Sequence, residues 1–196
     1  KAVARQANEV LAADLRLRSP EPIPDSWREL AGDYGLQTAD LLSFPTVVYA
    51  GESSALSTIS AVTPGYPLRG TVRLADRLFG DERAADGIPP PGEVWVDSSL
   101  IARVGASVGD LLEVGNSALR IGAIVTYRPD QSIGFASLAP TLLMNVDDID
   151  ASGLIGTGSR VRYALLVAGN DDRVAEFNAA IEDQLPDSLR LRSAEE

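Results

Sequence analysis

Near the start of the chain, the stretch Asp14-Leu-Arg-Leu-Arg-Ser19 alternates leucine with arginine, and it returns near the end as Ser188-Leu-Arg-Leu-Arg-Ser193. Strict alternation predicts two half-buried strands, each with leucines on one face and arginines on the other. The simpler interpretation of the likeness is that any half-buried strand alternates. The alternative is that the two strands are neighbours in one sheet, which gives the chain a definite topology.

The segments between these strands fit that alternative. Periodicity predicts a helix over 27–34 behind a Ser26–Glu29 capping box, strands over 44–49, 56–62, 140–146 and 160–167, and a final helix capped by Asn170–Asp172. Strand–helix–strand–strand, a β-rich interruption and then strand–helix–strand is a ferredoxin-like layout with an insertion. The predicted fold class is therefore α+β.

The insertion begins where the loops become rich in glycine and proline, near Tyr66-Pro-Leu-Arg-Gly70. It is predicted to hold strands over 71–74, 93–96, 111–114 and 119–127, and a helix over 99–104 that Ser98 caps and Gly105 ends. The predicted boundaries are 1–68 with 140–196 for the ferredoxin-like part, and 69–139 for the insertion.

The ferredoxin-like layout brings four arginines together. Its first and last strands are antiparallel neighbours, and one face of its sheet carries no helix, so Arg16, Arg18, Arg190 and Arg192 are predicted to share that face. Four like charges need acidic partners, from this chain or from another. These arginines are candidate contacts for a partner or substrate. Phe135, in the loop 128–139, is another, because it packs back onto the domain or touches a partner.

Composition excludes many chemistries. The chain contains no Cys and no His, and its only Lys is Lys1. These absences rule out a Ser-His-Asp triad, a thiolate nucleophile, a Cys- or His-based metal site and a catalytic lysine. The net charge of −11 argues against nucleic acid and against an anionic membrane surface. We expect no catalytic, cofactor-binding or metal-binding residue.

Two acidic motifs are candidate exceptions to the expected absence of catalytic and metal-binding residues. Asp147, Asp148 and Asp150 are candidate carboxylates for a free-standing hydrolase or metal-dependent enzyme, although a solvated acidic turn explains them better. The loop 148–159 begins like an EF-hand, but Ser159 stands where a bidentate Glu is required, which favours a turn over a calcium site. The segment 153–158 is rich in glycine, yet a strand-like run follows it, so nucleotide binding is rejected.

A series of short motifs resembles a known family. Gly92-Glu-Val-Trp-Val-Asp97, Ser99-Leu-Ile-Ala-Arg-Val-Gly105, Val108-Gly-Asp-Leu-Leu-Glu-Val114 and Leu119-Arg-Ile-Gly-Ala-Ile-Val125 follow one another. In this order they resemble the periplasmic core domain of ABC transporter permeases of the MacB/FtsX type. The resemblance implies a ferredoxin-like "porter" subdomain interrupted by a β-rich "sabre" subdomain, in agreement with the layout predicted from periodicity.

Further pieces resemble the YbbP-like branch of these permeases, namely Tyr66-Pro-Leu-Arg-Gly70, Arg128-Pro-Asp130, Ala139-Pro140 and Gly158-Ser-Arg-Val161. The resemblance implies a non-catalytic extracytoplasmic module, placed in the periplasm between the first and second transmembrane helices of a bacterial inner-membrane protein. Its implied partners are those helices, a cytoplasmic ABC ATPase subunit and, in some genomes, a periplasmic esterase or lysophospholipase. The implied substrate is hydrophobic or lipid-like.

No stretch of the sequence reaches the roughly 18 consecutive apolar residues of a membrane span. The chain starts with Lys rather than Met, and it begins within a helical pattern. We therefore expect it to be one loop of a membrane protein.

Overall fold

The two Leu-Arg-Leu-Arg stretches lie side by side in the computed structural model, which describes residues 8, 11–131, 139–182, 184 and 190–193. Strand β1 (Leu15–Ser19) pairs antiparallel with β11 (Arg190–Ser193), with Leu15 opposite Ser193 and Arg16 opposite Arg192. The predicted pairing of the first and last strands is confirmed. The start of β1 and the end of β11 therefore lie at the same end of the sheet.

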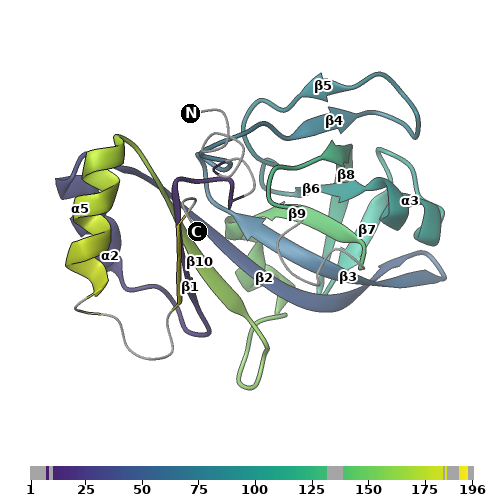
Figure 1. Ribbon diagram of the computed structural model, residues 1–196. Helices are drawn as coiled ribbons and strands as arrows, with labels where there is room; N and C mark the ends of the chain where they lie inside the picture. Colours follow the sequence, from purple (N-terminus) through teal and green to yellow (C-terminus); the bar gives the residue numbers. More distant parts are fainter. Residues whose placement is uncertain (1–7, 9–10, 132–138, 183, 185–189, 194–196) are drawn as a thin grey trace.

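A ferredoxin-like sheet is built around this pair, in the order β11-β1-β10-β2. Its other strands are β2 (Gln37–Ala50) and β10 (Arg162–Ala168), and all neighbours are antiparallel. Helices α2 (Asp25–Asp33) and α5 (Asp171–Glu182) lie on its outer side (Figure 1). Buried Leu15, Leu17, Trp27 and Phe177 join the helices to the sheet in one core. The predicted α+β, ferredoxin-like class is confirmed.

The inserted part is a closed barrel. Its strands are β2, β3 (Ser53–Val62), β9 (Thr141–Asn145), β6 (Glu93–Asp97), β8 (Ser117–Tyr127) and β7 (Leu111–Val114). Each pairs with the next in that order, and β7 closes the ring on β2. Apolar residues fill the interior, and those of α3 (Ser98–Val104) join the same core. Closure leaves no unpaired edge in this part of the sheet.

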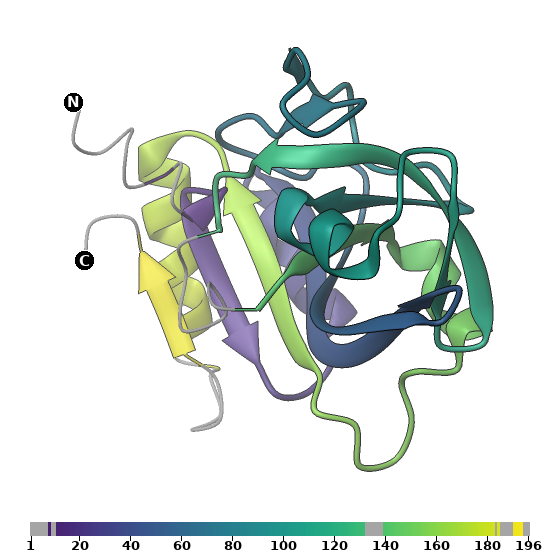
Figure 2. The same cartoon turned by 90° about the vertical axis from the view of Figure 1, so that its right-hand side faces the viewer.

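Smaller elements pair with the barrel strands or follow them in the chain. A hairpin of β4 (Arg73–Ala75) and β5 (Arg83–Ala84) pairs with β8 through β4. The short helices η2 (Val146–Asp148) and α4 (Ile149–Ser152) follow β9. Figure 2 shows α3 in front of the barrel and the β4–β5 hairpin standing above it.

Strand β2 belongs to both parts. Its first half pairs with β10 in the ferredoxin-like sheet, while its second half pairs with β7 in the barrel. Strands β3 and β9 pair within the barrel although the sequence boundaries placed them with the ferredoxin-like part. The division into 1–68 with 140–196 and 69–139 stays a proposal, and the pairing favours an inserted part that starts within β2.

Two predicted helix caps are wrong. Helix α2 begins directly after Pro24 with no side-chain cap, because Ser26 already lies in the first turn. Helix α3 is capped by Asp97, whose carboxylate accepts a hydrogen bond from the Leu100 N–H at 2.8 Å, and not by Ser98. The αL conformation of Gly105 at the end of α3 is as predicted.

Candidate functional site

A buried polar cluster lies where the ferredoxin-like sheet meets the barrel. We call it the Asp130 joint; it consists of Arg16, Tyr66, Arg128 and Asp130. Arg128 Nε and Nη2 donate to the two carboxylate oxygens of Asp130 at 3.0 and 3.1 Å. The Tyr66 hydroxyl donates to the same carboxylate at 2.6 Å. Arg16 Nη1 lies 3.6 Å from Asp130 Oδ2.

The four members come from three different parts of the fold. Arg16 lies on β1, Tyr66 follows β3, and Arg128 and Asp130 follow β8. Arg128 also donates to the Ser60 hydroxyl of β3 at 3.3 Å, and its guanidinium lies 5.8 Å from the centre of the Tyr66 ring. The joint therefore connects the first strand of the ferredoxin-like sheet with two segments that leave the barrel.

The electrostatics of the joint depend on burial and pairing together. Burial alone would raise the pKa of Asp130, but Arg128, Arg16 and the Tyr66 hydroxyl lower it to about 2. Burial opposes the charge of Arg128, yet the Asp130 carboxylate raises the pKa of that guanidinium above its ordinary value. Burial lowers the pKa of Arg16 and raises that of Tyr66. Asp130 is thus held as a carboxylate facing two buried guanidinium groups.

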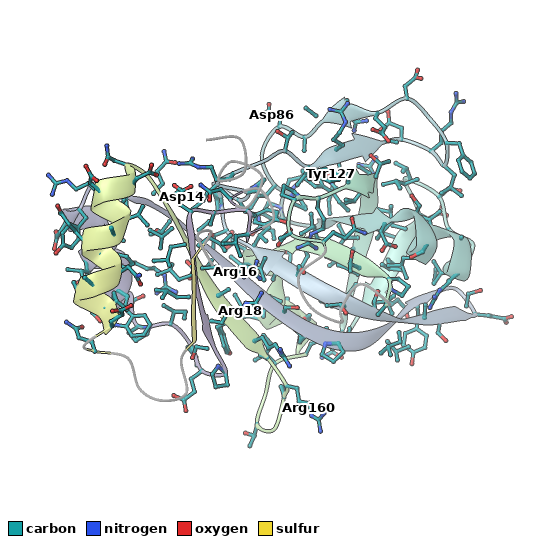
Figure 3. The ribbon with its side chains drawn as sticks, viewed as in Figure 1. Asp14, Arg16, Arg18, Asp86, Tyr127 and Arg160 are labelled. Carbon is teal, nitrogen blue, oxygen red and sulfur yellow. The ribbon has the colours of Figure 1, made fainter. Side chains whose placement is uncertain are left out.

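A second contact ties the start of β1 to the loop after β3. Arg69 Nε and Nη2 donate to the Asp14 carboxylate at 2.9 and 2.7 Å. The Gly169 N–H donates to Asp14 at 2.9 Å, and the N–H groups of Leu68 and Arg69 donate to the Ala12 carbonyl at 3.0 and 3.1 Å. We call this contact the Asp14 clamp. Figure 3 shows Asp14 just before β1 and Arg16 and Arg18 on that strand, so the clamp and the joint lie in one short segment.

Of the four arginines predicted to share one face, only the side chains of Arg16 and Arg18 are described. Arg16 is buried, and the acidic partner that it needs is Asp130 of the same chain. Arg18 is half-buried on the same side of β1. The backbones of Arg190 and Arg192 pair with those of Arg18 and Arg16, while their side chains, like Phe135, lie outside the description. A partner or substrate role for these five residues stays a prediction.

The acidic motif does not form the arrangement that a hydrolase needs. Asp147 and Asp150 are exposed, and Asp148 accepts a hydrogen bond from the Gly92 N–H at 2.8 Å. Residues 149–152 form α4 rather than an EF-hand loop, and Gly153 ends that helix. Within the described ranges, no three His, Cys, Asp or Glu side chains come together as metal ligands.

A shallow groove runs beside that motif, and its first half is apolar while its second half is of mixed polarity. Leu42, Val146 and Tyr163 line both of its halves, whose volumes are about 230 and 480 Å³. Ile23 and the Arg28–Asp40 ion pair border the first half, and Asp147 and Asp150 border the second. The groove lies between α2, β10 and the short helices after β9, at the outer side of the junction.

Sequence reasoning missed the joint, the clamp and several exposed apolar side chains. Tyr66, Arg69, Arg128 and Asp130 stood in motifs of the YbbP-like branch, but nothing indicated that they meet. Exposed apolar residues lie on the outside of β2, β3 and β7 and at the β4–β5 turn: Val47, Tyr49, Leu56, Leu111, Leu78 and Phe79. Leu78 and Phe79 stand among charged residues in the sequence, a pattern that does not by itself predict exposure.

Comparison with known proteins identifies transporter domains that share this fold. No family model matches it. Its structure is similar to the extracellular domain of the noncanonic ABC-type transporter YknZ from Gram-positive bacteria, with a TM-score of 0.60 and 8% identity over 91% of this chain and 100% of that one. It is also similar to the periplasmic region of MacB from Actinobacillus actinomycetemcomitans, with a TM-score of 0.57 and 12% identity over 100% of this chain and 95% of that one. The fold is that of an extracytoplasmic domain of these transporters.

One curated relative refines this class. The chain is 30% identical over 198 residues to the uncharacterized ABC transporter permease YbbP of Escherichia coli K12, across 100% of this chain. It spans 23% of the length of that permease. Over its whole length the chain is therefore similar to a segment of an ABC transporter permease, and it has the fold of the extracytoplasmic domains of YknZ and MacB. No helix in the described part of the chain is long and apolar enough to cross a membrane.

Proposed function

We propose that this domain passes movement from the membrane-embedded part of a permease to its barrel. ATP hydrolysed by a separate cytoplasmic subunit would thereby drive the handling of a hydrophobic or lipid-like molecule outside the membrane. The observation that carries the proposal is the Asp130 joint together with the Asp14 clamp. Both bind the strand that begins the ferredoxin-like sheet to segments that leave the barrel.

The geometry supports transmission rather than independent movement. The described ends of the chain meet at one end of the sheet, where Leu15 lies opposite Ser193. A displacement that enters there reaches Asp14 first and Arg16 two residues later. Because Asp14 is bonded to Arg69 and Arg16 faces Asp130, the segments after β3 and β8 must follow. Breaking either contact would leave buried charge without its partner, which is costly.

The groove beside the acidic motif supports the substrate class through its apolar first half. Its shared lining of Leu42, Val146 and Tyr163 offers an apolar surface at the junction of the two moving parts. A periplasmic esterase or lysophospholipase is proposed as a partner on the YbbP-like resemblance alone. We also infer that the chain performs no covalent step, since Asp147 and Asp150 are exposed and Asp148 is bonded to backbone.

A distance measurement tests the proposal. The chain contains no Cys, so cysteines introduced at Asp81 on the β4–β5 turn and at Asp171 on α5 carry spin labels at two defined points. The full permease with its ATPase is placed in nanodiscs, and the inter-label distance is measured without nucleotide and with ATP and vanadate. We expect a nucleotide-dependent shift that falls by at least half in Tyr66→Phe and in Arg69→Ala.

The matched control is Glu93→Gln, which weakens the exposed Arg120–Glu93 pair on the barrel and leaves the joint intact. It should preserve the shift. An equal shift in all three variants would refute transmission through the joint and the clamp. The absence of any nucleotide-dependent shift in the unaltered protein would refute the coupling itself.

A further inference from the structure

The turn of the β4–β5 hairpin presents an aromatic side chain to solvent. Phe79 is 104% exposed, and its neighbour Leu78 is 38% exposed. Phe79 belongs to none of the three hydrophobic cores of the described chain. A phenylalanine on a surface turn gains nothing from burial in its own fold, so its contribution must be sought elsewhere.

The backbone of this turn is strained at the same residue. The Gly80 N–H donates to the Arg77 carbonyl at 3.1 Å, which makes Leu78 and Phe79 the central pair of a β-turn. Phe79 has φ of 59°, a left-handed conformation in which glycine is usual and bulky residues are rare. Gly80 is needed for another reason, because a Cβ there would lie 2.7 Å from Arg77 Cγ. Strained residues cluster at functional sites, so the strain at Phe79 is a reason to look for a role of this turn.

The base of the hairpin is braced, so the turn projects from a fixed support. Arg73 pairs with Glu82 at 3.2 Å, and Arg83 pairs with Asp76 at 2.8 Å. Strand β4 is held to β8, and the Ala85 N–H donates to the Val72 carbonyl at 2.8 Å. A partner that binds the turn therefore meets a preorganised shape and loses less entropy on binding.

The charges around the turn restrict what it can bind. Segment 76–86 holds four carboxylates and two arginines, and Asp81 and Asp86 have no ion pair within the described residues. Asp81 lies beside the turn, whereas Asp86 lies at the base of the hairpin, next to Ala85, whose N–H donates to the Val72 carbonyl (Figure 3). An anionic lipid surface would repel these carboxylates, and so would a second copy of a chain with net charge −11.

We propose that Phe79, with Leu78, is a docking anchor for a protein whose apolar pocket is bordered by lysine or arginine. The anchor fills the pocket, while Asp81 faces the basic border. An aromatic anchor at the centre of a charged rim is the usual anatomy of a binding hot spot. This proposal rests on the proposed function only for the extracytoplasmic location of the domain. It does not depend on the Asp130 joint.

Photo-crosslinking in living cells tests this anchor. Benzoylphenylalanine replaces Leu78 in the full permease in its own host, so that Phe79 itself can be varied. We expect one discrete adduct with a protein when Phe79 is present and when it is Phe79→Trp. We expect the adduct to fall at least tenfold in Phe79→Gly, a change that relieves the positive φ and so keeps or raises the thermal midpoint of the chain.

The identified protein is then purified, and its affinity for the chain is measured at two salt concentrations. Phe79→Gly should weaken binding at least tenfold, Phe79→Trp should stay within about threefold, and Asp81→Lys should weaken binding mainly at low salt. Vesicles of phosphatidylethanolamine and phosphatidylglycerol serve as the lipid comparison.

Four outcomes would overturn the anchor: no adduct, an adduct with lipid alone, an adduct with a second copy of the chain, or an adduct that Phe79→Gly leaves unchanged. The two proposals can fail separately. A lost nucleotide-dependent distance shift with an intact Phe79 adduct would refute the coupling and leave the anchor standing.

Discussion

Replacing Asp130 with asparagine tests the Asp130 joint most directly. The side chains of Asp130, Arg128 and Arg16 are only 2%, 6% and 9% exposed, so water cannot screen the charges that remain. Asparagine keeps the shape of the residue and an oxygen for the Tyr66 hydroxyl. The substitution therefore removes charge while it disturbs the packing little.

The expected loss of stability follows from two estimates. The pKa of Asp130 is about 2 in the fold against 3.8 for the free side chain, which corresponds to about 2 kcal/mol of stability above pH 4. Removing one partner of a buried ion pair costs more, about 3 to 5 kcal/mol, because the other charge stays buried without compensation. Since two arginines lose their counter-charge here, we expect the free energy of unfolding to fall by about 3 to 5 kcal/mol.

Urea denaturation followed by tryptophan fluorescence measures this loss. Trp27 reports on the ferredoxin-like part and Trp95 on the barrel, and both are buried. Asp76→Asn is the control, because Asp76 forms an exposed pair with Arg83 and should cost less than about 1 kcal/mol. A loss below about 1 kcal/mol for Asp130→Asn would show that the joint does not hold its charges as described.

Three further results are expected. The stabilisation that Asp130 supplies is present above pH 4 and is lost as the pH falls through about 2, because the folded pKa is depressed; an acid titration of the urea midpoint should lose this step in Asp130→Asn. Gly115→Ala should destabilise the chain by more than about 2 kcal/mol in thermal melts, because φ is 60° and a Cβ would lie 2.3 Å from the Ser152 carbonyl oxygen. Gly51→Ala is the control: its φ is 59° but the space around it is open, so it should cost less in the same melts. Asp97→Ala should cost about 1 to 2 kcal/mol in urea, since that carboxylate accepts from the N–H groups that begin α3 and β9; a loss no larger than that of Asp76→Asn would contradict the cap.

The strands of the fold could be predicted from alternation, but their ends could not. Strand β7 matches its predicted range of 111–114, because its alternating side chains face the barrel core and the solvent in turn. Strand β2 was predicted over 44–49 and extends over 37–50. The first half contains the half-buried Asp40, whose carboxylate is compensated by the Arg28 guanidinium that bonds it. Such a partner, twelve residues away, cannot be read from a local pattern.

The candidate site depended still more on distant contacts. Alternation placed Arg16 on the face of β1 that carries no helix, and this placement is consistent with the structure. It gave no sign that segments of the insertion cover this face, because Tyr66 and Asp130 are 64 residues apart. The exposure of Phe79 was equally inaccessible, since a lone aromatic between charged residues predicts burial as readily as exposure.

The continuity of β2 has a mechanical consequence. Fourteen residues at about 3.3 Å each give a strand of at most about 45 Å, which runs from the helix-covered sheet to the hairpin that joins β3. Its ladder hydrogen bonds continue through the boundary between the two parts, so bending there would break them. If the strand rotated as a rigid unit, a rotation of about 5° at one end would move the other end by about 4 Å over that length. Small angular changes at the base would then become displacements at the far hairpin that are large enough to open or close a contact.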